Sequence, residues 1–145
     1  RDLHPPALES VELAEALRAE CETFARRAQM RVDFRCDALP AGLSSEVALA
    51  IYRIVQEGLR NVRTHSGVRE ARVWLQAGPQ ALRLEISDEG SGFNPTDPRL
   101  RQGLGLSSLR ERARLAGGEL HVDSRQGQGT RLVFTLDAKA WGGAG

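Results

Sequence analysis

The chain has 145 residues, of which 41% are hydrophobic and 27% are charged, a composition typical of a single globular domain with a real core. Its 20 Lys and Arg residues balance its 19 Asp and Glu residues, so no excess charge favours nucleic acid or an anionic membrane surface. No apolar run approaches the ~20 residues that a membrane span needs, and no signal-peptide pattern is visible.

Residues 1–9 are expected to form an extended linker, because two consecutive prolines exclude a helix interior there. A helix is predicted from Ser10, since apolar residues recur every three or four positions as far as Ala28. Alternating apolar and charged residues at 32–36 then predict a short strand. Cys21 and Cys36 could pair, but both lie in apolar patterns without a partner at metal-ligand spacing, which favours buried free thiols.

A second helix is predicted from Ser45 to His65. At ~100° per residue, Asn61 falls inside the buried arc of this helix, and Glu57 lies at the edge of the arc one turn earlier. Burying such polar groups without partners costs ~1–3 kcal/mol, so they either cap a neighbouring loop or serve a site, and spacing alone leaves both open. The apolar residues of the arc are Val47, Ala50, Ile51, Ile54, Val55, Gly58, Leu59 and Val62.

Two strands follow at 71–77 and 82–88, joined by a turn that contains Gly78 and Pro79. In the second strand Arg83, Glu85 and Ser87 should face outward, whereas Asp88 keeps the parity of the inward-facing residues. The strand therefore delivers a carboxylate to the core side, unless Asp88 only starts a turn. Gly90 and Gly92 then permit a positive φ or a close backbone approach.

Residues 94–102 are polar and without periodicity, which indicates a loop. A helix with apolar residues from Leu106 to Ala116 follows Gly103 and Gly105, and two glycines end it. A strand at 120–122, a glycine-rich turn at 124–129 and a last strand at 132–136 complete the pattern, and Thr130 shares the inward parity of that strand. Residues from 137 onward are expected to fray.

These residues suit a nucleotide. Asp88 can accept from the exocyclic amino group of adenine and would repel the carbonyl of guanine, and Thr130 could share that recognition. Gly103 and Gly105 before a helix offer backbone N–H groups to phosphates. Glu57 and Asn61 offer the oxygen ligands that Mg²⁺ prefers. A dinucleotide fingerprint lacks the strand that should precede it, and the Gly-Lys-Ser/Thr sequence of a P-loop does not occur.

Four segments resemble the ATP-binding domain of bacterial sensor histidine kinases, within the gyrase–Hsp90–histidine kinase–MutL ATPase superfamily. QEGLRNVRTHSG at 56–67 resembles the asparagine box, and DEGSGF at 88–93 resembles the first glycine box. GLGLSSLRERARLAGGEL at 103–120 resembles the second glycine box, and GQGTRLVFTL at 127–136 resembles the final strand. The linker RDLHPPALE at 1–9 and the short lid resemble the subfamily of nitrate, oxygen and envelope-stress sensors.

The resemblance implies an α+β two-layer sandwich, the Bergerat ATP-binding fold, with a mixed and mostly antiparallel sheet of about five strands covered on one face by three helices. It implies a linker at 1–9, a kinase domain at 10–137 and a flexible tail at 138–145. The cofactors would be ATP and Mg²⁺. Glu57 and Asn61 would be the catalytic residues, with Asn61 as the metal ligand and Glu57 approaching the metal through water. The implied ATP-binding residues are Asn61, His65, Asp88, Gly90, Gly92, Phe93, Gly103, Leu104, Gly105, Leu106 and Thr130.

A lysine often precedes the histidine of this asparagine box, and here Thr64 takes its place, so phosphate binding would depend more on His65, Arg60 or Arg63. The acceptor histidine is not expected in the chain, because His4 is followed by two prolines and His121 should be solvated. The implied partners are dimerisation and phosphoacceptor helices, a second copy in the full-length protein and a response regulator. Neither nucleic acid nor direct membrane contact is expected.

The implied location is the cytoplasm, either as an independent protein or as the cytoplasmic part of a membrane-bound sensor. Two alternatives share the same sequence segments. One is a serine kinase of the anti-sigma-factor type, which usually stands alone and lacks such a linker. The other is a non-catalytic nucleotide-binding module, against which the presence of Glu57, Asn61, Asp88 and all four glycines argues.

Overall fold

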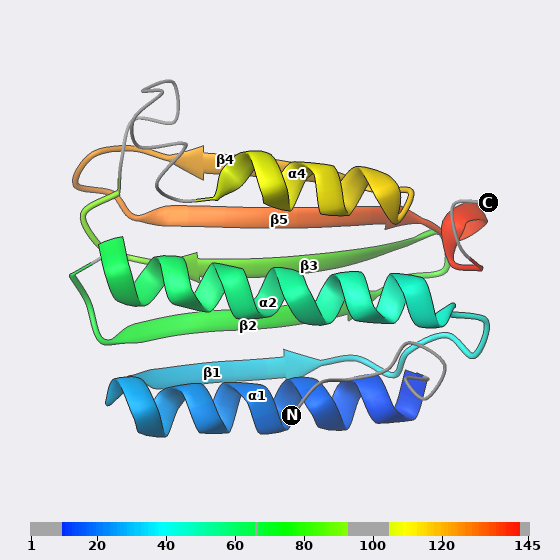
Figure 1. The fold of residues 1–145 in the computed structure, drawn as a ribbon, viewed down its shortest axis with the longest axis horizontal. Coiled ribbons are helices and arrows are strands. Elements are labelled where there is room, and N and C mark those ends of the chain that lie inside the picture. Colours follow the sequence, from blue (N-terminus) through cyan, green and yellow to red (C-terminus); the bar gives the residue numbers. More distant parts are fainter. Residues whose placement is uncertain (1–9, 66, 93–104, 143–145) are drawn as a thin grey trace.

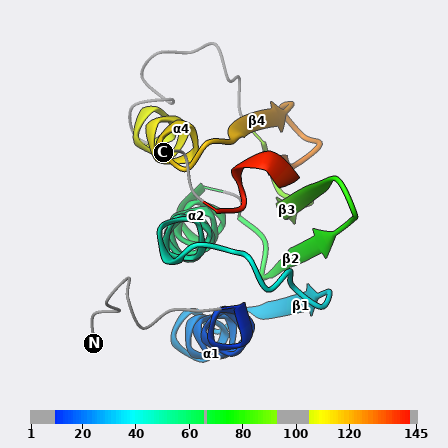
Figure 2. The same ribbon diagram turned by 90° about the vertical axis from the view of Figure 1, so that its right-hand side faces the viewer.

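In the computed structural model, which describes residues 10–65, 67–92 and 105–142, one sheet carries helices on a single face (Figures 1 and 2). The five strands lie in the order β1-β2-β3-β5-β4, and all neighbours are antiparallel except β1 and β2. The predicted two-layer α+β sandwich with a mixed sheet is therefore confirmed. The elements are α1 (Ser10–Ala28), β1 (Arg31–Cys36), α2 (Ser45–His65), β2 (Glu70–Ala77), β3 (Ala81–Asp88), α4 (Leu106–Leu115), β4 (Glu119–Ser124), β5 (Thr130–Asp137) and the 3₁₀ helix η2 (Ala138–Ala140).

Helix α2 lies over the middle of the sheet, and its predicted apolar arc forms much of the core. The Ser44 hydroxyl starts the helix by accepting a hydrogen bond from the Val47 N–H at 3.1 Å, as an N-cap residue does. Gly58 allows the helix to approach β3 closely, because a Cβ at Gly58 would lie 2.7 Å from Cδ1 of Ile86. This close approach fixes the height of α2 above the strand that ends at Asp88.

Strand β3 is the centre of the sheet, paired with β2 on one side and β5 on the other. Glu85 and Ser87 face the side without helices, as predicted, yet they are only 7% and 3% exposed. Arginine side chains of the same face cover Glu85, since Arg83 lies 2.9 Å and Arg131 3.7 Å from its carboxylate oxygens. In this part of the sheet, an outward-facing position is therefore not a solvated one.

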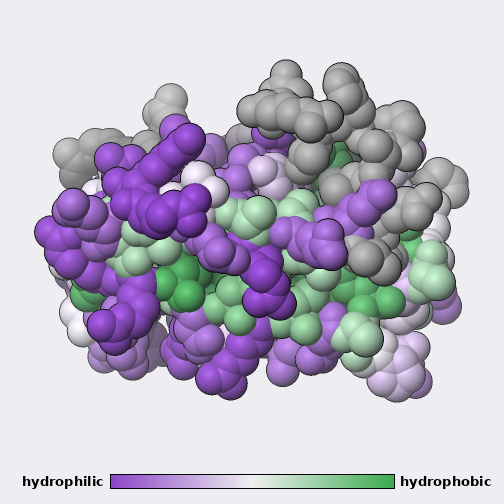
Figure 3. Space-filling model, turned by 90° about the horizontal axis from the view of Figure 1, so that it is seen from below, coloured by the Kyte–Doolittle hydropathy of each residue, from purple (hydrophilic) through white to green (hydrophobic). Residues whose placement is uncertain are grey.

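Strand β1 forms one edge of the sheet and keeps a half-exposed apolar side. Figure 3 shows an apolar strip along the side of the molecule that α1 and β1 form. Cys36, at the end of β1, is half-buried, because no further strand covers the edge. Both cysteines are free, and burial raises the pKa of the Cys21 thiol to about 12. The prediction of a buried free thiol is therefore confirmed for Cys21. For Cys36 the thiol is free, as predicted, but the prediction that it is buried is wrong.

The C-terminal residues continue the fold beyond the last strand. Asp137 caps η2 by accepting from the Lys139 N–H at 2.9 Å, and the Trp141 carbonyl accepts from the Ser44 N–H at 2.7 Å. The tail thus contacts the start of α2, and the expectation of fraying from Asp137 onward is wrong as far as Trp141. Among the helices of residues 10–65 and 105–142, none is long and apolar enough to cross a bilayer.

Candidate nucleotide site

One end of the molecule gathers most of the predicted site residues. The end of α2, the end of β3, the start of β5 and the start of α4 all lie there (Figure 1). Phe93, Gly103, Leu104 and the predicted lid at 94–102 lie outside the described residues, as does the side chain of His65. The predicted residues that can be placed are Glu57, Asn61, Asp88, Gly90, Gly92, Gly105, Leu106 and Thr130.

Asp88 is the buried acceptor of this end. Its side chain is on the helix-covered face, as its parity predicted, and the residue is only 9% exposed. One carboxylate oxygen accepts a hydrogen bond from the Gly90 N–H at 2.7 Å. Burial raises the pKa of Asp88, although hydrogen bonds from the backbone N–H groups of Gly90 and Thr130 oppose the rise. The carboxylate can therefore accept a further donor from a ligand.

A row of three polar residues crosses the sheet at the level of Asp88. Asp88 pairs with Thr130 in β5, and Thr130 pairs with Ser124 in β4. The Ser124 and Thr130 hydroxyl oxygens are 2.8 Å apart, and the Ser124 hydroxyl donates to the Gly129 carbonyl at 3.2 Å. The sequence interpretation placed Ser124 in a glycine-rich turn and missed it; its parity with Leu120 and Val122 is the signal that could have assigned it to β4.

Glycines allow the backbone segments around Asp88, Gly92 and Arg125–Gly129 to approach one another closely next to this row. Gly92 and Gly129 have φ of 65° and 86°, a region that favours glycine. A Cβ at Gly92 would collide with the Arg125 carbonyl oxygen, and one at Gly129 would collide with the Asp88 carbonyl oxygen. Gly90 instead contributes its N–H to Asp88. The prediction of positive φ or close backbone approach is thus confirmed for Gly92.

Helix α2 presents Glu57 and Asn61, one turn apart, to the same end of the fold. The Glu57 carboxylate accepts from Arg60 at 2.7 Å, so Arg60 contacts a carboxylate of its own helix. The Glu57 oxygen also lies 3.8 Å from the position that a Cβ on Gly105 would take. Asn61 is half-buried. Glu57 therefore faces the start of α4 while it is paired with a cation of α2.

The start of α4 has no side-chain cap, and Gly105 takes the N-cap position with a φ of 68°. The Gly105 carbonyl accepts from the Leu109 N–H at 3.0 Å, which closes the first turn. Backbone N–H groups at such a helix start attract anions. Leu106 is only 1% exposed, so its side chain belongs to the core and only its backbone is available to a ligand.

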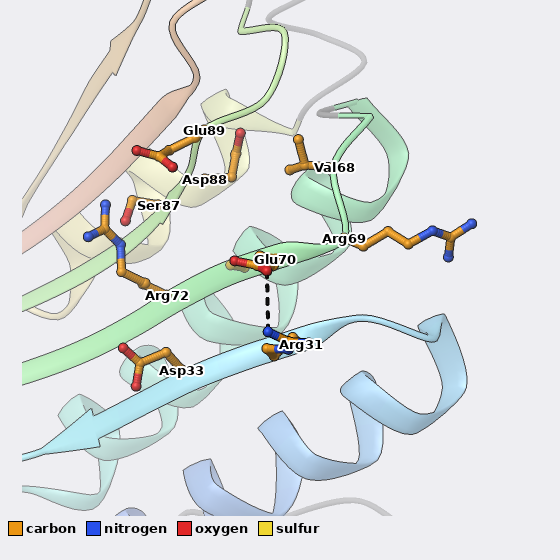
Figure 4. Close-up of a pocket in the computed structure, with 10 residues that line it drawn as sticks. Arg31, Asp33, Val68, Arg69, Glu70, Arg72, Ser87, Asp88 and Glu89 are labelled. Atoms are coloured by element: carbon orange, nitrogen blue, oxygen red, sulfur yellow. Dashed lines mark ion pairs between the residues drawn. The ribbon is translucent and has the colours of Figure 1, made fainter.

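A hollow of about 570 Å³ lies on the open face of the sheet (Figure 4). Its charged residues are partly paired with one another, as between Arg31 and Glu70 at 3.5 Å. In Figure 4 the side chains of Ser87 and Asp88 point in different directions from adjacent positions of β3. The Ser87 hydroxyl is buried without a hydrogen-bond partner in the described part of the chain. Asp88 is among the residues that line this hollow, so the hollow reaches the strand end that carries the Asp88 carboxylate.

The buried carboxylate at a strand end and the uncapped helix start offer an acceptor and free backbone N–H groups, as a nucleotide site requires. The sequence pattern of the histidine kinase-, DNA gyrase B- and HSP90-like ATPases matches residues 46–140. The chain belongs to this family.

Two curated relatives are similar over nearly the whole chain. The oxygen sensor histidine kinase NreB of Staphylococcus carnosus is 31% identical over 136 residues, which cover 94% of this chain and 39% of NreB. The sensor histidine kinase MctS of Rhizobium johnstonii is 32% identical over 141 residues, which cover 96% of this chain and 30% of MctS. The chain thus spans 39% of the length of NreB and 30% of the length of MctS.

Solved structures share the fold. The histidine kinase domain of a blue-light activated histidine kinase from Erythrobacter litoralis superposes with a TM-score of 0.76 at 21% identity, over 90% of this chain and 63% of that one. The catalytic domain of histidine kinase ThkA superposes with a TM-score of 0.69 at 17% identity, over 90% of this chain and 92% of that one. The superposition on ThkA covers nearly all of that catalytic domain, so the described fold corresponds to almost a whole histidine kinase catalytic domain.

Proposed function

We propose that this chain is the ATP-binding domain of a two-component sensor histidine kinase. It would bind ATP with Mg²⁺ and present the γ-phosphoryl group to a histidine on a separate helical domain, for relay to an aspartate of a response regulator. The observation that carries the proposal is the buried Asp88 carboxylate, 9% exposed, beside a glycine-shaped loop and an uncapped helix start. The relatives named as sensor histidine kinases support it.

Each residue of the site has a role that its position supports. Asp88 accepts from the adenine amino group, and Thr130 lies in register beside it. The backbone N–H groups at the start of α4 bind phosphate oxygens. Glu57 orients or deprotonates the attacking imidazole, or positions a water of the metal. The charge neutralisation that phosphoryl transfer needs comes from Mg²⁺ when it is bound.

Asn61 is the residue that would hold Mg²⁺. Among the described residues, no three His, Cys, Asp or Glu side chains gather where they could share a metal ion. Mg²⁺ commonly keeps several waters and takes one or two protein oxygens together with substrate phosphates, so a single carboxamide fits this preference. Binding of Mg²⁺ at Asn61 would accordingly require the phosphate oxygens of a bound nucleotide.

The phosphoryl acceptor is expected on another domain. His121 is exposed on β4, where Glu119 lies 3.4 Å from it, and it faces away from the helix-covered side. The proposed partners are dimerisation and phosphoacceptor helices, a second copy of the full-length protein and a response regulator. The proposed organisation is a linker at 1–9 followed by the kinase domain, and the contact between Trp141 and Ser44 assigns Trp141 to that domain.

The test combines binding with transfer. Calorimetry of the purified chain should show ATP binding that Mg²⁺ strengthens, and γ-labelled ATP should not label the chain itself. Addition of a dimerisation domain that carries the acceptor histidine should give acid-labile label on that domain. A folded chain that binds no ATP overturns the proposal. Acid-stable label on a serine would instead favour the serine kinase of the anti-sigma-factor type, and binding without transfer would favour a non-catalytic module.

A further inference from the structure

Two contacts of the Ser124 hydroxyl with described residues together fix the orientation of a neighbouring hydroxyl. The residue is 6% exposed and ends β4 on the helix-covered face. Its Oγ lies 3.2 Å from the Gly129 carbonyl oxygen and 2.8 Å from Oγ1 of Thr130. Thr130 in turn is the cross-strand neighbour of Asp88.

The direction of both hydrogen bonds follows from counting protons. A carbonyl oxygen only accepts, and a serine hydroxyl has one proton, so the Ser124 proton is directed to Gly129. The 2.8 Å contact with Thr130 then requires Thr130 to donate and Ser124 to accept. We infer that Ser124 is a positioning residue that directs the Thr130 proton away from the base, so that Thr130 acts only as an acceptor towards the nucleotide.

This inference rests on the proposed function and deepens it. It assigns part of the selectivity for adenine to Ser124, a residue that need not contact the base. Asp88 and Thr130 then present two acceptors side by side, which match the amino group of adenine directly or through a water. Guanine has a carbonyl oxygen at that ring position and meets no donor. A Thr130 hydroxyl that rotates freely could donate to this oxygen, so the discrimination would weaken.

Ser124→Ala tests the inference, with Ser87→Ala as the matched control. Ser87 is a buried serine near the same end of the sheet, but it lies on the opposite face, and its hydroxyl has no partner among the described residues. Competition against a fluorescent ATP analogue would give the dissociation constants of ATP and GTP. Ser124→Ala should weaken ATP about threefold to tenfold and narrow the ATP-over-GTP ratio by about tenfold, the effect of one hydrogen bond. Ser87→Ala should leave the ratio unchanged.

Two further variants separate positioning from simple loss of structure. Ser124→Thr keeps a hydroxyl at the position and should restore the ratio. In a Thr130→Val background there is no hydroxyl to orient, so Ser124→Ala should change the ratio no further. An unchanged ratio in folded Ser124→Ala, or an equal change in both backgrounds, overturns the inference. Failure of the wild-type chain to bind ATP would instead contradict the proposed function.

Discussion

Glu57 of α2 faces Gly105 at the start of α4, where a Cβ on the glycine would lie 3.8 Å from Glu57 Oε1. The helix start attracts anions, and the carboxylate beside it is held by Arg60 at 2.7 Å. A phosphate group bound to α4 would therefore lie close to a carboxylate already paired with a cation. Substitutions at Gly105 and at Glu57 can therefore test separately the backbone conformation of the helix start and the charge of the neighbouring carboxylate.

Gly105→Ala should destabilise the fold by about 1–2 kcal/mol, because φ is 68° and alanine is strained there. It should also weaken ATP binding, since relief of the strain would move the first N–H groups of α4. Gly67 has a φ of 75°, and a Cβ added to it would meet nothing within 4 Å, so Gly67→Ala is the control for strain alone. Urea unfolding and calorimetry measure the two effects; equal ATP affinity in both variants would contradict the role of the α4 start.

Gly129→Ala should be much more harmful than Gly127→Ala. Both residues have positive φ, 86° and 80°, so both variants carry similar backbone strain. Only a Cβ at Gly129 collides with backbone, at the Asp88 carbonyl, whereas nothing lies within 4 Å of one at Gly127. We expect a loss of about 1 kcal/mol for Gly127→Ala and about 3 kcal/mol or more for Gly129→Ala in the free energy of unfolding. Similar losses in the two variants would show that the close approach of Gly129 to the Asp88 carbonyl does not affect stability.

Glu57→Gln should reduce phosphoryl transfer while leaving stability nearly unchanged. Its ion pair with Arg60 spans three residues of a helix, as does the pair of Glu111 and Arg114 at 2.6 Å. Exposed pairs of this kind contribute little to stability, so Glu57→Gln and Glu111→Gln should unfold at similar denaturant concentrations. Transfer from ATP to a supplied histidine domain should fall at least tenfold only for Glu57→Gln. Equal transfer rates in the two variants would remove Glu57 from the proposed chemistry.

Asp88→Asn should abolish measurable ATP binding, a loss of about a hundredfold or more, because the amide presents a donor where the adenine amino group needs an acceptor. Asp123 is an exposed carboxylate near the same end of the sheet, on β4, and Asp123→Asn provides the control for charge. Calorimetry with Mg²⁺ and ATP compares the two. Wild-type affinity in Asp88→Asn would exclude the assigned role.

The same Asp88→Asn variant should alter the pH dependence of stability. Burial raises the folded-state pKa of Asp88 above its ordinary value of 3.8, so ionisation of this group disfavours the folded state. The cost is absent at low pH, where both states are protonated, and it grows as pH rises from the ordinary pKa through the raised one. The stability of Asp88→Asn relative to wild type should therefore increase from about pH 4 towards neutrality. A difference that is constant with pH would contradict this assignment.

The sequence determined most of the helices and strands and the face on which Asp88 and Thr130 lie, because periodicity and parity are local. The apolar stripes predicted α1, α2 and α4, and inward parity placed Asp88 and Thr130 on the covered face before the strands were paired. The roles of Asn61 and Glu57 in the site are proposals. The structure supports them by placing both residues on α2, at the end of the fold where β3 ends and α4 begins.

Only the tertiary structure decided which residues meet. Strand register, a non-local property, aligned Ser124 with Thr130, and neighbouring strands supplied the arginines that cover Glu85. The contact of Trp141 with the start of α2, and the approach of Glu57 to the start of α4, likewise join segments far apart in the chain. Such contacts depend on the packing of whole elements, because the local pattern that forms a helix or strand does not specify its neighbour.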